Sequence, residues 1–249
     1  MQRFYIPYFE KKDIFILDDK DIFHQLVKVL RIRIWEQIIF FDWVKNIDFV
    51  FEIVEINKKN IELKFVEEIE KETETYFELN LFQAMPNKME KIEYILQKWV
   101  EIGYKKFVFY RSERSQKMVI SDKKLERLKK IIIEAVEQSW RSFVPEFEIQ
   151  SVGCECIRTL QGKSLFLHTK NNNSQNLSEF INSLSTEGFS PLQTIKQNLN
   201  IFIWPEWWFS ENEIENFEKN KFARIHLWNR ILRTETAGIV VWFTLWQMI

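Results

Sequence analysis

The chain has 249 residues, 46% of them hydrophobic, and a formal net charge of -1 at pH 7. This length is sufficient for one large domain or two smaller ones with hydrophobic cores. The sequence pI of about 6.4 excludes an overall nucleic-acid-binding charge signature, so such binding would depend on local patches. No apolar run approaches the roughly 18 residues of a membrane helix, and the charged N-terminal segment is unlike a signal peptide. We therefore expect no membrane partner.

The two cysteines, Cys154 and Cys156, are separated by a single residue. This spacing is unfavourable for a disulfide, and no histidine lies near enough in the sequence to complete a metal site. We interpret both residues as reduced thiols, and we predict a cytoplasmic protein without a bound metal.

Residues 1–72 have the pattern of a small β-barrel with one helix. The stretches "DIFILDD", "EQIIFFDW", "DFVFEIVEI" and "NIELKFVEEI" predict short strands separated by polar turns. The stretch "DIFHQLVKVLRI" predicts a helix, because it places four apolar residues on one face: Ile22, Leu26, Val27 and Leu30. The polar segment 70–77, "EKETETYF", marks the boundary between this region and the C-terminal one.

Strands and helices alternate in residues 73–249, which favours an α/β domain with a mostly parallel sheet. Strands are predicted for "FELNLFQAM", "KKFVFY", "SLFLHT", "LNIFI" and "ARIHLW". Helices are predicted for "KMEKIEYILQKWVEIGY", which ends near Gly103, for "DKKLERLKKIIIEAVEQS" and for "TETAGIVVWFTLWQ". The polar stretch 170–198 is expected to be a loop with room for one short helix.

The segment "NIFIWPEWWFSENEIENF", residues 200–217, predicts a tight strand-to-helix turn. Its apolar start is typical of a buried strand, and Ser210 with Glu213 has the spacing of a capping box. Such a turn usually contains glycine, which permits positive φ and close approach of the backbone to a ligand. Here it contains three of the bulkiest side chains: Trp204, Trp207 and Trp208.

Several long stretches carry a family resemblance. They are "IEAVEQSWRSFVP" at 133–145, "IWPEWWFSENEIE" at 203–215 and "LWNRILRTETA" at 227–237, with "ILQKWVEIGYKKFVFYRSERS" at 95–115. They resemble the RsmE family of SPOUT methyltransferases, which reads E-Q-S-G-R, G-P-E-G-G-F-S and L-G-x-R-I-L-R-T-E-T-A. The N-terminal "HQLVKVLRIRIWEQIIFFDW" is similar to that family's V-L-R-x-x-x-G-(D/E) segment. The resemblance therefore covers almost the whole chain.

This resemblance implies a fold, an activity and a cofactor. It implies a PUA-like RNA-binding β-barrel over 1–72, then a SPOUT methyltransferase domain over 73–249 with a parallel sheet and a C-terminal trefoil knot, a rare exception to unknotted topology. The implied activity is methylation of N3 of a uridine in small-subunit (16S) ribosomal RNA by a homodimer that uses S-adenosyl-L-methionine. The implied cofactor-binding residues are Leu167, His168, Ile203, Trp204, Pro205, Glu206, Trp207, Trp208, Leu227, Trp228, Ile231, Leu232, Arg233, Thr234, Glu235 and Thr236.

The candidate catalytic residues are Arg114, Glu137, Gln138 and Arg141. A cation beside the uracil oxygens would stabilise the deprotonated base, which suits either arginine, and Glu137 or Gln138 could orient the base or accept its proton. The alternative for each charged residue is a structural salt bridge. The sequence does not assign the residue that acts as general base.

Two further features favour contact with RNA. Arg31 and Arg33 are candidates for phosphate contacts, with an exposed helix end as the alternative. From Lys98 to Arg141 the chain has twelve Lys and Arg among six acidic residues. That stretch alone favours a solvated helix face, but beside the family resemblance it favours contact with the RNA backbone.

In seven places this chain has tryptophan where the family has glycine: Trp35, Trp43, Trp140, Trp204, Trp207, Trp208 and Trp228. The chain has 10 Trp and only 5 Gly, roughly threefold fewer glycines than average usage gives. Because glycine sites exclude even a Cβ atom, seven independent changes to the largest side chain are a poor explanation. We hypothesise that the source reads UGA as glycine and that the translation used a table that reads it as tryptophan.

On this hypothesis the chain as written would bind the cofactor poorly, because indoles would fill its pocket. Codons that read UGG at these positions would exclude the hypothesis; Trp99, Trp242 and Trp246 are left open.

The alternatives are a SPOUT methyltransferase that acts on another RNA site and, if the tryptophans are genuine, an inactive RNA-binding protein. An interaction module unrelated to RNA would leave "RILRTETA" unexplained.

Overall fold

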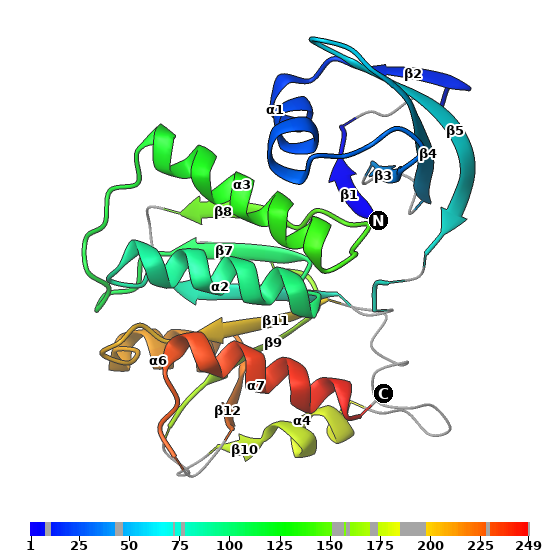
Figure 1. Cartoon of the computed structure of the whole chain (residues 1–249). Coiled ribbons are helices and arrows are strands. Elements are labelled where there is room, and N and C mark those ends of the chain that lie inside the picture. The colour runs from blue at the N-terminus through cyan, green and yellow to red at the C-terminus, as the bar shows by residue number, and fades with distance from the viewer. Residues whose placement is uncertain are drawn as a thin grey trace. The chain divides into compact units, whose positions relative to one another are not determined.

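The computed structural model describes residues 1–7, 11–42, 47–71, 73–75, 78–150, 157, 160–169, 174–184, 198–227 and 230–248 (Figure 1). They divide into two compact units: Met1–Glu74 with Val136–Val144, and Thr75–Ala135 with Pro145–Ile249. The predicted cysteine thiols at 154 and 156 lie outside the described residues. The division into 1–72 and 73–249 stays a prediction, and the structure groups Val136–Val144 with the N-terminal residues.

The N-terminal unit is built on a five-stranded sheet in the order β1-β3-β4-β5-β2. Its strands are β1 (Gln2–Tyr5), β2 (Ile14–Leu17), β3 (Gln37–Phe41), β4 (Ile47–Ile56) and β5 (Ile61–Glu70). A short helix α1 (Lys20–His24) continues into the π-helical turn η1 (Gln25–Leu30). The four predicted strands and the helix are confirmed, and β1 is an addition. Within the described residues the ladder ends at β1 and β2, so this sheet is barrel-like but not closed.

Aromatic residues fill the core of this unit. Phe40 and Phe51 are fully buried, and their ring centroids lie 5.8 Å apart. Both rings also contact Phe15, which belongs to β2 on the far edge of the sheet. The curvature of the sheet thus encloses one aromatic cluster.

A buried ion pair joins the start of the chain to this unit. The Arg3 guanidinium donates to the Asp48 carboxylate at 2.8 Å, and the side chains are 2% and 0% exposed. Arg3 also donates to the backbone carbonyl of Arg141 and to the hydroxyl of Ser142. The pair therefore ties β1 to β4 and to the Val136–Val144 segment.

The C-terminal unit contains a seven-stranded, all-parallel sheet in the order β10-β12-β9-β11-β6-β7-β8 (Figure 1). Its strands are β6 (Leu79–Ala84), β7 (Lys106–Tyr110), β8 (Glu146–Gln150), β9 (Lys163–Leu167), β10 (Gln175–Asn176), β11 (Leu199–Ile203) and β12 (Ala223–His226). Its helices are α2 (Met89–Ile102), α3 (Asp122–Gln138), α4 (Leu177–Ser183), α6 (Glu211–Lys219) and α7 (Thr234–Trp246). The predicted parallel sheet, five strands and three helices are confirmed.

The central strands of this sheet are buried on both faces. Every residue of β6 and of β11 is buried, which is the pattern of a parallel strand with helices on both sides. Gly103 ends α2 with a φ of 106°, the left-handed cap for which glycine is suited. The short strands β8 and β10 were not predicted, and the trefoil knot stays a prediction.

The strand order places a crevice beside β6. From β6 the chain continues to β7 and β8 on one side, while β11, β9 and β12 lie on the other. Ligands of open parallel sheets bind outside the carboxyl ends of the strands where the winding direction changes. The topology therefore points to the carboxyl ends of β6 and β11.

Three tryptophans adopt a backbone conformation that favours glycine. The φ angles are 77° at Trp35, 60° at Trp140 and 63° at Trp208. This left-handed region costs a residue with a Cβ atom about 1–2 kcal/mol. Each of the three is among the seven positions where the family has glycine. The backbone at these three positions therefore has a conformation that suits glycine.

Loss of the Arg3 side chain should strongly destabilise the N-terminal unit. Arg3→Met removes the guanidinium from the fully buried Asp48, which keeps its ion pair with Lys71, so the free energy of unfolding should fall by about 1.5–3 kcal/mol. Lys11→Met removes an exposed ion pair with Glu68 and should change the free energy of unfolding by less than about 1 kcal/mol. Urea unfolding of both variants measures the contrast. Equal effects would show that the buried pair has no special role.

Candidate active site

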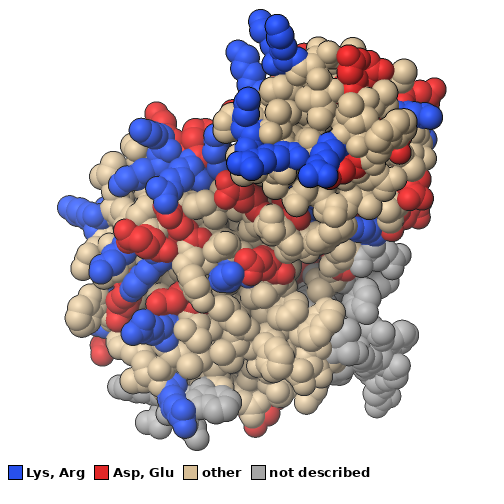
Figure 2. Space-filling model, in the orientation of Figure 1, with Lys and Arg blue, Asp and Glu red and all other residues tan. Residues whose placement is uncertain are grey.

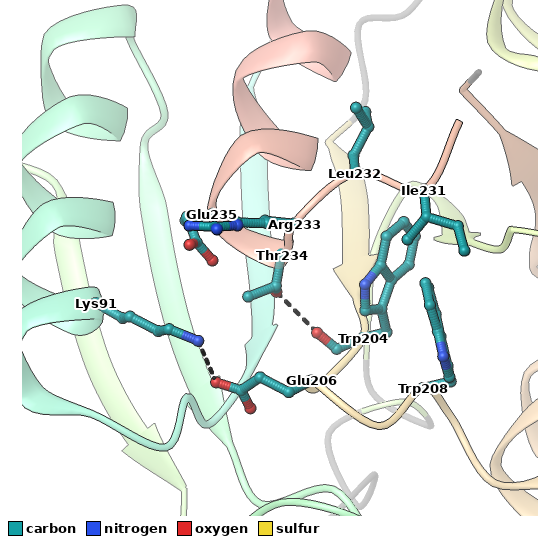
Figure 3. Close-up of a pocket in the computed structure, with 9 residues that line it drawn as sticks. All are labelled: Lys91, Trp204, Glu206, Trp208, Ile231, Leu232, Arg233, Thr234 and Glu235. Carbon is teal, nitrogen blue, oxygen red and sulfur yellow. Dashed lines mark hydrogen bonds and ion pairs between the residues drawn. The ribbon is translucent and has the colours of Figure 1, made fainter. Parts of the chain in front are cut away.

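A cavity of about 250 Å³ lies at the carboxyl end of β11 (Figure 3). It is formed by α2, by the turn between β11 and α6, and by the segment that leads into α7. Its lining residues are Lys91, Trp204, Glu206, Trp208, Ile231, Leu232, Arg233, Thr234 and Glu235. The cavity occupies the crevice to which the strand order points.

The turn after β11 is stabilised at both ends. The backbone N–H of Trp208 donates to the carbonyl of Pro205 at 3.1 Å, which closes the turn. Ser210 and Glu213 form both hydrogen bonds of the predicted capping box, at 3.1 and 2.8 Å. The turn therefore runs directly into α6, as the sequence predicts.

Buried hydrogen bonds hold this turn against the start of α7. The Thr234 hydroxyl donates to the carbonyl of Trp204 at 2.8 Å. The Gln83 amide, at the end of β6, donates to the Thr234 hydroxyl at 2.7 Å. The same amide lies 3.4 Å from the Trp204 carbonyl. Three segments far apart in the sequence are thereby fixed around one carbonyl group.

An ion pair forms the opposite wall of the cavity. The Lys91 ammonium donates to Glu206 at 2.8 Å, and the backbone N–H of Asn87 donates to the same oxygen at 3.1 Å. Burial alone would raise the pKa of Glu206, but these hydrogen bonds and the charge of Lys91 lower it below the usual range. Glu206 is therefore a fixed carboxylate that orients the turn.

The indoles of Trp204 and Trp208 stand side by side within the cavity (Figure 3). Their ring centroids are 5.2 Å apart, and Trp204 is 4% exposed. On the other side, the Glu235 Oε2 atom is buried and has no hydrogen-bond partner among the described residues. The cavity thus combines an unsatisfied carboxylate oxygen with two large apolar rings.

Comparison with known proteins identifies the family. A family model described as RNA methyltransferase domain matches residues 73–246. Ribosomal RNA small subunit methyltransferase E of Buchnera aphidicola subsp. Acyrthosiphon pisum is 30% identical over 222 residues, 87% of this chain and 81% of that protein. Its Bacillus subtilis counterpart is 27% identical over 251 residues, 96% and 93% of the two chains. The chain belongs to the ribosomal RNA small subunit methyltransferase E family.

Solved structures agree with this family in fold. A ribosomal RNA small subunit methyltransferase E from Neisseria gonorrhoeae, bound to S-adenosyl methionine, has a TM-score of 0.82 at 25% identity and covers 99% of this chain and 97% of its own. A methyltransferase from Legionella pneumophila, in complex with the same cofactor, has a TM-score of 0.83 at 25% identity, with 98% and 96% covered.

Most residues that the methyltransferase E family implies for the cofactor lie at the cavity. Eight of them line it: Trp204, Glu206, Trp208, Ile231, Leu232, Arg233, Thr234 and Glu235. Ile203 and Pro205 are buried beside it, and Thr236 is exposed in the first turn of α7. Trp207 is 64% exposed.

The remaining members of that set lie elsewhere. Leu167 and His168 lie at the end of β9, where His168 donates its backbone N–H to Ile225, and neither lines the cavity. Leu227 follows β12, and Trp228 lies outside the described residues.

Of the candidate catalytic residues, Arg114 is held at the turn. Its exposed guanidinium donates to the carbonyl of Trp207 at 3.2 Å. Glu137 and Arg141 belong to the other unit, where Glu137 accepts from the Tyr5 backbone N–H and Arg141 pairs with Glu74 at 2.6 Å. Gln138, in that unit too, is exposed. Catalytic roles for all four stay predictions, and the structure gives three of them, Arg114, Glu137 and Arg141, a contact within the protein.

Two contributors to the site were missed. Lys91 and Gln83 lie outside the recognised motifs, and each bonds to a residue more than 100 positions away. Gln83 has one visible signal, a buried amide in a mostly apolar strand, which it shares with Asn80.

Figure 2 shows basic side chains among acidic ones on the visible face of each unit. In the N-terminal unit Arg31 and Arg33, which follow η1, are exposed. In the C-terminal unit Arg127 of α3 pairs with Glu93, and Lys129 pairs with Glu126. Part of the basic stretch from Lys98 to Arg141 is therefore neutralised locally.

The described residues contain no helix that is long and apolar enough to cross a membrane. They also contain no cluster of three or more His, Cys, Asp and Glu side chains that could hold a metal ion.

Removal of the Thr234 hydroxyl should loosen the cavity. In Thr234→Val the Trp204 carbonyl loses its shorter hydrogen bond and the Gln83 amide loses an acceptor, so the free energy of unfolding should fall by about 1–3 kcal/mol. Thr244→Val is a matched control, because that hydroxyl donates only to Val240 within α7. Urea unfolding compares the two. A larger loss in the control would contradict the role assigned to Thr234.

The contribution of Glu206 should depend on pH. Its folded-state pKa lies below the unfolded value, so its stabilisation is present above the unfolded pKa and is lost as the pH falls through the folded pKa. Glu206→Gln should therefore cost about 1 kcal/mol at pH 7, and this difference should shrink below about pH 4. Glu215→Gln, in an exposed pair with Lys219, serves as control. A difference that is constant from pH 7 to pH 3 would contradict this account.

Proposed function

We propose that the protein is an S-adenosyl-L-methionine-dependent methyltransferase that modifies N3 of a uridine in small-subunit (16S) ribosomal RNA. The proposal places it in the cytoplasm, where its rRNA substrate is, and as a homodimer. Family membership and the relatives named above support rRNA as the substrate. The N3 position follows from the resemblance of "RILRTETA" and its companion motifs.

The observation that carries the proposal is the meeting of two motifs at one cavity. The turn after β11 and the segment before α7 both contribute lining residues, and the Thr234–Trp204 hydrogen bond joins them. Backbone groups, the N-terminus of α7 and the unsatisfied Glu235 oxygen provide the few convergent polar groups that a ligand pocket needs.

The cofactor does not fit the cavity as the sequence is written. The cavity measures about 250 Å³, below the roughly 300–1,000 Å³ of ligand pockets. The two indoles take up the space that a purine or ribose would need beside the backbone. The loop framework thus supports a nucleoside-type ligand, while the side chains at 204 and 208 oppose it.

The chain's own residues suggest how the substrate would be held. Arg114 lies at the turn with an exposed guanidinium, which could stabilise negative charge on a deprotonated uracil. Arg31 and Arg33 are exposed and could bind phosphates. Glu137 and Gln138 stay candidates for orienting the base or accepting its proton, and Arg141 stays a candidate for stabilising its negative charge.

Exposed apolar surface on α7 supports the proposed homodimer. Phe243 is 57% exposed and Trp246 is 49% exposed. Large apolar side chains exposed together on one helix are typical of an interface.

One observation favours a second candidate function. If Trp204 and Trp208 are genuine, their rings close the cavity, and the protein would be an RNA-binding member of the family without methyltransferase activity. Action on another RNA position is the third possibility.

The test is methylation of small ribosomal subunits that lack N3-methyluridine, with mass spectrometry of the rRNA nucleosides. The chain with glycine at 35, 43, 140, 204, 207, 208 and 228 should produce N3-methyluridine. Arg114→Ala in that background should lower the rate by about 10²-fold, while Arg127→Ala, which breaks an exposed ion pair on α3, should not. A different methylated nucleoside would support action at another position. RNA binding by both forms without methylation would support the inactive protein.

A further inference from the structure

We infer that the working protein carries glycine at positions 35, 140, 204 and 208, and that its gene encodes them with UGA, which the source reads as glycine and the printed sequence gives as tryptophan. For positions 204 and 208 the inference rests in part on the proposed function. For positions 35 and 140 it rests on the backbone alone.

Left-handed backbone is concentrated at the tryptophans of this chain. Among the described residues, φ is positive at two glycines, at three tryptophans and at two other residues, Arg31 and Lys221. Tryptophan makes up 10 of 249 residues, so chance would place fewer than one there. Bulky side chains avoid this region, because Cβ meets the following carbonyl oxygen.

The ring at position 35 has little packing role, and the ring at position 140 is only partly buried. Trp35 is 75% exposed and Trp140 is 42% exposed. Trp140 contacts the Lys71 ammonium, which also pairs with Asp48. A solvent-facing indole on a left-handed residue gains little from burial to offset its backbone cost.

The polar framework of the cavity does not depend on the two rings inside it. Trp208 combines positive φ with a ring that lies against Trp204. Glycine at both positions would remove two indoles from the lining. It would also keep the carbonyl of residue 204 as acceptor for Thr234, because that bond involves only backbone at position 204. Glycine at 204 and 208 therefore opens the cavity and leaves its hydrogen bonds in place.

Trp99 differs from these four. It lies within α2 and is fully buried, and its backbone is helical. A Cβ on Gly238 would approach its ring to 2.5 Å, so the two positions are matched in size. Its indole N–H nevertheless has no hydrogen-bond partner among the described residues. The structure makes no demand for glycine at position 99, which stays outside the inference.

Peptide mass spectrometry of the protein isolated from its source tests the inference directly. Peptides with glycine at 35, 140, 204 and 208, encoded by UGA, are the expected result. Peptides with tryptophan, encoded by UGG, would overturn the inference whatever the protein does.

Calorimetric titration with S-adenosyl-L-methionine separates this inference from the proposed function. The chain as written should show no binding, and the form with Trp204→Gly and Trp208→Gly should bind. At about 100 times Kd the ligand should raise the Tm of that form by roughly 5–10 °C. Trp246→Ala, on the exposed end of α7, is the control and should not create binding. If the native peptides contain glycine but the double variant does not bind S-adenosyl-L-methionine, the inference is upheld and the proposed cofactor is overturned.

Discussion

The candidate site depends on one buried carbonyl group, that of Trp204. It ends β11, accepts from the Thr234 hydroxyl, and lies within reach of the Gln83 amide. These bonds lie away from water, where an unsatisfied polar group is costly, so β6, β11 and the start of α7 must keep their positions together. Every wall of the cavity except Lys91 belongs to a segment that this network holds. A hydrogen bond to backbone fixes the site while leaving the side chain at that position open to change.

The order of the strands explains why the cavity is there. Parallel strands need crossover connections, so the loops after β6 and β11 emerge at the same edge of the sheet. The sequence predicts β6 and β11 because they are short, mostly apolar segments, and it predicts the start of α6 because a capping box is local. It does not predict β8 or β10, which are short, outer strands of the sheet with polar residues. Lys91 and Gln83 were missed for a related reason: their partners are set by the sheet and not by spacing.

Family motifs predict residue types better than they predict contacts. The "EQSWR" stretch suggested catalytic side chains, yet Glu137 accepts from the Tyr5 backbone and Arg141 pairs with Glu74. These contacts lie beside the Arg3–Asp48 pair, which joins the same segment to β1 and β4. A charged residue that anchors a segment is constrained as strongly as one that acts on a substrate. Arg114 differs from those two candidates in that its guanidinium donates to the Trp207 carbonyl, at the turn that borders the cavity.

At the tryptophans, the effect of a residue on the backbone conformation can be distinguished from its effect on ligand binding. At positions 35, 140 and 208 the chain adopts left-handed φ although an indole is attached, and backbone hydrogen bonds lie at or next to each of these positions. At position 204 the carbonyl is essential to the network while the ring occupies the cavity. Selection for a closed pocket could explain Trp204 and Trp208, but it gives no reason for strained, exposed tryptophan at 35 and 140. One change in how a codon is read accounts for all four positions, and it restores the residue that each backbone already fits.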